Sequence, residues 1–138
     1  MNPDQDVNAR GKVMWLGLGL AALAALSYVL MAIGVLGAGD AEGPPFIVYT
    51  AATCYLVGGV LILTRRRGLW IAGAVINALI LVFWFQAYQA RPAVLLSSGG
   101  IVSKTAQVLL ELCLLYLLLG DWLRRRTPST PPNRLTAH

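Results

Sequence analysis

The chain has 138 residues, of which 57% are apolar and 12% are charged, and its formal net charge is +5 at pH 7. A soluble domain carries roughly twice that share of charged residues, about 25%, so the composition argues against a soluble enzyme and favours a membrane protein. The cations are divided among separate short segments. This argues against a nucleic-acid interface, since no folded surface is available to present them to a groove.

Four apolar stretches take up most of the chain, and each holds 19 to 24 residues. A hydrocarbon core ~30 Å thick needs about 20 helical residues, so each stretch is long enough to cross a bilayer. The sequence therefore predicts an all-α integral membrane protein, a four-helix bundle of antiparallel spans. The spans are 13–36, 46–64, 69–90 and 101–119.

The first stretch also follows Arg10 and Lys12, as the apolar region of a secretory signal peptide would. Such a region is ~7 to 15 residues long, whereas this stretch has 24. We therefore expect a membrane span here.

The positions of lysine and arginine predict the orientation of the spans. Of eleven such residues, nine lie on one side of the predicted spans. They are Arg10, Lys12, Arg65, Arg66, Arg67, Arg124, Arg125, Arg126 and Arg134. Since cytoplasmic flanks carry the excess of lysine and arginine, both termini are predicted to be cytoplasmic, in a multi-pass protein of the plasma membrane, such as a bacterial inner membrane.

Three parts are expected along the chain: a cytoplasmic N-terminal segment (1–12), a four-span domain (13–123) and a disordered cytoplasmic tail (124–138). The connection before the last span contains a short apolar segment, Ala93 to Leu96, which we interpret as a loop, the alternative being a contact with the membrane interface. No connection is long enough to form a catalytic domain. The protein is therefore predicted not to be an enzyme.

Metal, haem and thiol chemistry find little support in the sequence. Cys54 and Cys113 both fall near the middle of predicted spans, without a CxxC pair, and a lone thiol there usually behaves as a small apolar residue. The single histidine is His138, in the tail. We therefore predict no metal site and no cofactor.

Polar residues inside the spans concentrate in the fourth. At 100° per residue, Lys104, Gln107 and Glu111 share one face. Glu111 is about ten residues, or ~15 Å, from either boundary, a depth at which a charge is costly. We therefore expect Glu111 to face other helices.

Partners for this face are predicted in the other three spans. Asn77 of the third span lies at a depth where its amide can meet Glu111, and Tyr28 of the first span and Thr53 of the second are expected to point into the same core. Tyr28 shares its face with four small residues, a pattern that permits close helix approach. They are Gly17, Ala21, Ala24 and Ala32.

Two functions remain open. The first is a non-enzymatic interaction or assembly subunit of a membrane complex, in which Glu111 is a structural carboxyl bonded to Asn77 or Tyr28. The second is a small proton-coupled transporter that acts as a homo-oligomer, with Glu111 as its titrating group. The expected partners are the lipid bilayer and other membrane subunits or further copies of this chain, and no nucleic acid.

In size, number of spans and single membrane glutamate, the chain resembles the small multidrug resistance exporters. That family carries its essential glutamate in the first helix, whereas the first span here contains no acid. The resemblance therefore extends to gross architecture and to none of the family's motifs.

Overall fold

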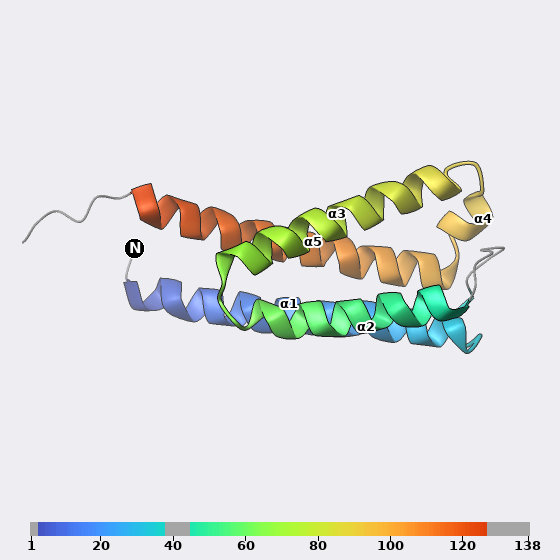
Figure 1. The fold of residues 1–138 in the computed structure, drawn as a ribbon, viewed down its shortest axis with the longest axis horizontal. Coiled ribbons are helices and arrows are strands. Elements are labelled where there is room, and N and C mark those ends of the chain that lie inside the picture. The colour runs from blue at the N-terminus through green and yellow to red at the C-terminus, as the bar shows by residue number, and fades with distance from the viewer. Residues whose placement is uncertain (1–2, 38–44, 127–138) are drawn as a thin grey trace, which may run out of the picture.

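The structure is a computed structural model that describes residues 3–37 and 45–126. Within these ranges the chain is helical and contains no strand. The helices are α1 (Pro3–Ala32), α2 (Pro45–Ile62), α3 (Arg67–Tyr88), α4 (Pro92–Leu95) and α5 (Ser98–Arg126). The four long helices run along the long axis of the molecule (Figure 1).

Three helices are long and apolar enough to cross a membrane. They contain the segments Asn8–Ala32, Arg67–Tyr88 and Ser98–Arg125. The apolar segment of α2, Phe46–Ile62, is shorter. Large apolar side chains, such as Trp15, Phe46 and Phe83, are turned outward. A water-soluble monomer rarely exposes apolar surface on this scale.

All four predicted spans are helical over most of their length, but several boundaries differ. The first helix begins at Pro3, so most of the predicted N-terminal segment is part of α1. At the other end of the chain, α5 continues through Arg126 and includes three arginines that we assigned to the tail. The rest of the predicted disordered tail, 127–138, lies outside the described residues.

The segment that we interpreted as a loop contains a one-turn helix, α4. Pro92 occupies its first turn, where the fixed φ of proline suits a helix and its missing N–H is not needed. Val94 is only 2% exposed, and α4 packs against both α3 and α5. The loop prediction was therefore wrong, because burial of Val94 holds this segment against the long helices.

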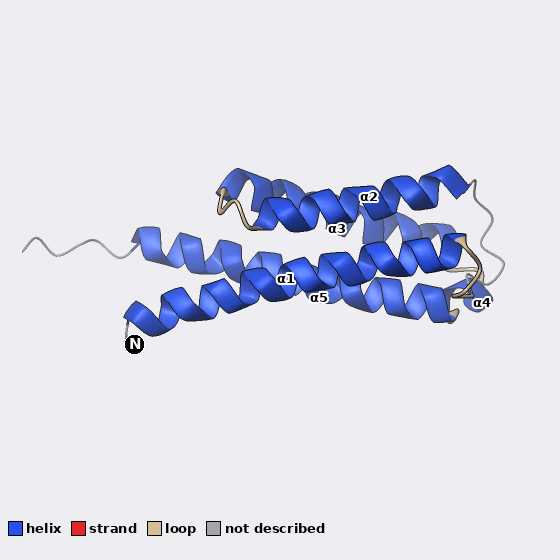
Figure 2. Ribbon diagram, turned by 90° about the horizontal axis from the view of Figure 1, so that it is seen from below, coloured by secondary structure: helices blue, strands red, loops and turns tan. Residues whose placement is uncertain are grey.

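The packing is uneven around the bundle. Helix α1 packs along both α2 and α5, and α3 packs mainly against α5 (Figures 1 and 2). By contrast, α2 and α3 share few contacts although a short turn joins them. At the end opposite this turn, the N–H of Gly37 donates to Ser98 Oγ at 3.2 Å and the N–H of Gly99 donates to the Gly37 carbonyl at 2.9 Å. These bonds join the end of α1 to the start of α5.

The predicted small-residue face of α1 does pack closely. Ala21 and Ala24 are 1% and 0% exposed, Gly17 is buried, and Ala32 is half-buried. A Cβ added at Gly59 of α2 would lie 2.9 Å from the Cβ of Ala21, so the two helices approach closely at this point. Small residues permit this approach, and van der Waals packing then stabilises the pair.

The inward face of α2 differs from the predicted one. Thr53 is exposed, and its Oγ1 donates to the Tyr49 carbonyl one turn earlier at 2.9 Å. Ala52, Tyr55 and Gly59 are buried instead. Two physical reasons explain the correction: Ala52 and Gly59 offer α1 a closer approach, and a threonine bonded within its own helix needs no partner on another one.

Candidate functional site

The five residues predicted to form a polar site come together inside the bundle. On α5, Lys104 Nζ donates to Gln107 Oε1 at 3.0 Å. Both side chains also reach α1, where Lys104 Nζ and Gln107 Nε2 contact the Tyr28 hydroxyl at 3.0 and 2.8 Å. The Lys104–Gln107–Tyr28 group therefore joins the first and last long helices.

Lys104 lies between aromatic rings. Its Nζ is 4.8 Å from the centre of the Trp84 ring on α3 and 5.5 Å from the centre of the Tyr28 ring. An ammonium group within about 6 Å of a ring centre is attracted by the negative face of the ring. In the described part of the chain Lys104 forms no ion pair, so its charge is balanced by oxygen dipoles and ring faces rather than by a carboxylate.

Asn77 of α3 joins this group to Glu111. Its Nδ2 donates to the backbone carbonyl of Gln107 at 2.9 Å and to Glu111 Oε2 at 3.0 Å. The contact expected between Asn77 and Glu111 is therefore present. Asn77 and Glu111 each lie near the middle of their helix, so this contact is far from both ends of the bundle.

Tyr55 of α2 completes the network, and the sequence analysis missed it. Its hydroxyl donates to Asn77 Oδ1 at 3.0 Å, and its ring stacks on that of Tyr28 with centres 5.8 Å apart. A signal was available, because Tyr55 lies between Ala52 and Gly59 at the spacing of one helix face. We call these six residues the polar network: Tyr28, Tyr55, Asn77, Lys104, Gln107 and Glu111.

The network is most enclosed at its two amides. Asn77 is 3% exposed and Gln107 is 0% exposed, whereas Tyr28, Lys104 and Glu111 are half-buried. No buried side-chain nitrogen or oxygen of the network lacks a hydrogen-bond partner. Since a buried polar group without a partner is costly, the network suits a permanent connection between α1, α2, α3 and α5.

The described residues contain no group of three or more histidine, cysteine or acidic side chains that could hold a metal ion. Cys54 is exposed and Cys113 is buried, and both are free thiols. Besides the network, charged side chains gather at the end of the bundle near the α2–α3 turn, where arginines line a pocket.

No known protein family, curated protein or solved structure matches this chain. Its function is therefore argued from its own residues.

Proposed function

We propose that this chain is a multi-pass protein of the plasma membrane and acts as a non-enzymatic interaction or assembly subunit of a membrane complex. In this proposal α1, α2, α3 and α5 all cross the bilayer as one four-helix bundle with both termini in the cytoplasm. The apolar exterior supports it. The 18 residues of α2 would span about 27 Å, which lies within the range of membrane helices.

The observation that carries the subunit proposal is the saturation of Asn77. Its amide oxygen accepts a hydrogen bond from Tyr55, while its amide nitrogen donates to Glu111 and to the Gln107 backbone carbonyl. A site that binds a passing substrate needs polar groups that are free to exchange partners. The amides of the polar network are instead committed to neighbouring helices, as in a scaffold with a fixed arrangement.

A surface for a partner helix is available on α2. Thr50, Cys54 and Gly58 are exposed and follow one another at four-residue spacing, and a Cβ added at Gly58 would meet nothing within 4 Å. Small residues at this spacing let membrane helices approach closely. This face fits a helix of another membrane subunit.

Affinity purification in a mild detergent, followed by mass spectrometry, tests the subunit proposal. We expect a second membrane protein in a fixed ratio, and we expect Gly58→Leu to reduce its recovery several-fold. Gly19→Leu is the control, because Gly19 of α1 is also exposed without a neighbour within 4 Å. Recovery of the chain alone as a symmetric oligomer would contradict the proposal.

The alternative function is a proton-coupled transporter, and the position of Glu111 favours it. Glu111 is only half-buried, and it lies near the middle of the apolar segment Ser98–Arg125 of α5. A carboxyl that the protein does not fully enclose can exchange a proton. In this alternative, Glu111 loses and gains a proton as substrate passes, in a homo-oligomer.

Two substitutions separate the functions. For a structural carboxyl, Glu111→Gln keeps the acceptor for Asn77 and should leave stability and assembly close to wild type, whereas Glu111→Ala should lower the stability by ~0.6 to 2 kcal/mol through the lost hydrogen bond. For a transporter, Glu111→Gln should abolish pH-dependent transport in proteoliposomes while the fold is kept. If both variants match wild type in stability, assembly and transport, both functions of Glu111 are wrong.

Cysteine labelling tests the proposed orientation. In a background without Cys54 and Cys113, a cysteine replacing Ser98 should react with an impermeant thiol reagent added to intact cells. A cysteine replacing Gly68, in the first turn of α3 near the α2–α3 turn, should react only after the cells are opened. Labelling of the Gly68 position from outside would overturn the orientation.

A further inference from the structure

The end of the bundle near the α2–α3 turn contains a pocket of about 260 Å³. Helices α1 and α5 run on beyond this turn (Figure 1), and residues of both helices line the pocket. We call it the arginine pocket. Among the described residues, its charged lining includes Arg10 of α1, Arg65 of the turn, Arg67 of α3, and Asp121, Arg124 and Arg125 of α5.

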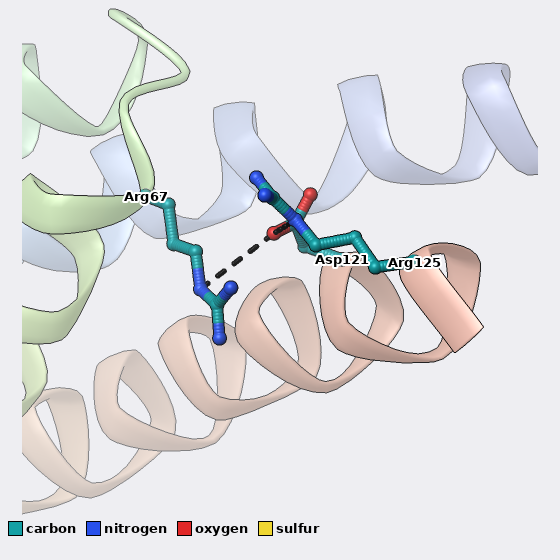
Figure 3. A network of polar contacts seen from close by, with 3 residues as sticks. All are labelled: Arg67, Asp121 and Arg125. Atoms are coloured by element: carbon teal, nitrogen blue, oxygen red, sulfur yellow. Dashed lines mark hydrogen bonds and ion pairs between the residues drawn. The ribbon is translucent and has the colours of Figure 1, made fainter.

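Among the side chains that the structure describes, guanidinium groups make up most of the charged lining of the arginine pocket, and Asp121 contributes a carboxylate. This carboxylate is shared, because its Oδ2 lies 3.7 Å from Arg67 Nε and 3.2 Å from Arg125 Nε (Figure 3). Like charges held close together repel one another. A bound anion would relieve this repulsion.

Membrane topology explains why arginines flank the helices, but it does not require them to line one pocket. Arg10, Arg65 and Arg125 come from three segments that are far apart in the sequence. The positive-inside rule would be satisfied equally well if these side chains pointed away from one another into water. Their convergence therefore needs a second reason.

One arginine donor in the pocket lacks an acceptor. The Nε of Arg67 is buried and makes no hydrogen bond, since Asp121 at 3.7 Å is too far for one. Buried N–H groups are nearly always paired, and an exception needs an explanation. An oxygen atom of an anion in the pocket would be the partner that this group lacks.

Two of the arginines are distinguished by their local structure. Arg65 has a φ of +56°, a left-handed conformation that is uncommon for a residue other than glycine. Arg10 lies directly against α5, because a Cβ added at Gly120 would be 2.7 Å from Arg10 Nη2. The absence of a side chain at Gly120 leaves the space that the guanidinium of Arg10 occupies.

We propose that the arginine pocket binds a phosphate group. A guanidinium group donates two parallel N–H bonds that match the oxygens of a phosphate, and several guanidinium groups around one pocket can share its charge. The volume is far larger than one water molecule requires, so a phosphate fits. Basic pockets between membrane helices on the cytoplasmic side bind the head groups of anionic lipids, and a soluble phosphate compound offers the same chemistry.

The proposal does not depend on which function Glu111 serves, because the pocket and the polar network share no residue. It also has a physical consequence for specificity. A zwitterionic head group brings its own cation, which the guanidinium groups of the pocket repel. Anions without an attached cation are therefore the preferred ligands.

Binding to the full-length protein in nanodiscs tests the proposal. One set of nanodiscs contains phosphatidylcholine alone and receives increasing pyrophosphate. A second set contains increasing fractions of phosphatidylglycerol, whose retention by the protein is measured by native mass spectrometry. Saturable binding in the first set identifies a soluble phosphate as the ligand, and preferential retention in the second identifies a lipid.

The combined variant Arg10→Gln and Arg67→Gln should lower the binding at least tenfold in whichever set is positive. Arg91→Gln is the matched control, since Arg91 is an exposed arginine that precedes α4 at the other end of the bundle, and it should bind as wild type does. Circular dichroism verifies that each variant keeps its helices. Equal binding by the combined variant and wild type, or no binding by wild type in either set, would overturn the proposal.

Gly120→Ala gives a second test that removes no charge. The added methyl group would displace the Arg10 guanidinium, which is the flexible end of a side chain, so the helices need not move. We expect binding to fall several-fold. Gly19→Ala, at a glycine with nothing within 4 Å, should leave it unchanged. Wild-type binding by Gly120→Ala would show that Arg10 does not contact the ligand, and it would contradict the proposed site.

Discussion

The polar network and the arginine pocket use polar side chains in opposite ways. In the network, the buried amides of Asn77 and Gln107 are surrounded by groups of the same chain that accept and donate their hydrogen bonds. In the pocket, Arg67 and Arg125 share the carboxylate of Asp121, and the Nε of Arg67 lacks an acceptor. A saturated cluster stabilises the fold, whereas a cluster with surplus donors has the capacity to bind something else.

This contrast predicts that substitutions in the network mainly change stability and that those in the pocket mainly change binding. Asn77→Ala should have the largest effect on stability. It removes three hydrogen bonds, and with ~0.6 kcal/mol for an average bond between membrane helices we expect a loss of about 2 kcal/mol. Unfolding in mixed micelles measures it.

Gln86→Ala is the control for Asn77→Ala. Gln86 is an exposed amide on the same helix, so its removal should change the free energy of unfolding little. If both variants unfold like wild type, the network does not stabilise the bundle, and the contrast with the arginine pocket disappears.

Tyr55→Phe should have an intermediate effect. It keeps the ring that stacks on Tyr28 and removes only the hydroxyl that donates to Asn77. We expect a loss of ~0.6 to 1.7 kcal/mol, the range for one hydrogen bond between membrane helices. The same measurement on Tyr116→Phe, at an outward-facing tyrosine of α5, should show no loss; equal losses in the two variants would mean that the bond to Asn77 contributes nothing.

Asp121→Asn should have the smallest effect on stability, below ~1 kcal/mol, because its arginine partners are 39% and 65% exposed and such ion pairs contribute little. Its effect on binding should be opposite in direction to that of removing arginines. Without this carboxylate the pocket is more positive, so anions should bind more tightly than to wild type. A stability loss as large as that of Asn77→Ala would show that the ion pairs, like the network, mainly hold helices together.

Hydrophobicity and helical periodicity predicted the long helices and the shared face of Lys104, Gln107 and Glu111, because both depend on local sequence. The contact between Asn77 and Glu111 also followed from their depth. The choice between Thr53 and Tyr55 did not, because it depends on how closely α1 and α2 approach each other. Such an approach is set by pairs of small residues on two helices, such as Ala21 and Gly59, and one helix alone does not reveal it.

The arginine pocket was missed for a different reason. The arginines were interpreted only as markers of topology, and Arg10 was assigned to a segment outside the first helix. That segment is polar, so hydropathy gives no sign that α1 begins at Pro3. Only when α1 and α5 both extend past the α2–α3 turn do arginines from three parts of the chain line one recess.

The order of the helices has a consequence for biosynthesis. Lys104 and Glu111 are the charged residues in the apolar part of α5, before Asp121. A charged side chain costs about 2.5 to 3.5 kcal/mol to place near the centre of a bilayer. Tyr28, which contacts Lys104, and Asn77, which donates to Glu111, precede these two residues in the chain, as does Tyr55, which donates to Asn77. Since a ribosome makes the N-terminal part first, in the proposed four-span arrangement α5 would enter a membrane in which α1, α2 and α3 already present the hydroxyl and amide groups that it requires. The least apolar helix is thus inserted last, where earlier helices can lower the free-energy cost of its insertion.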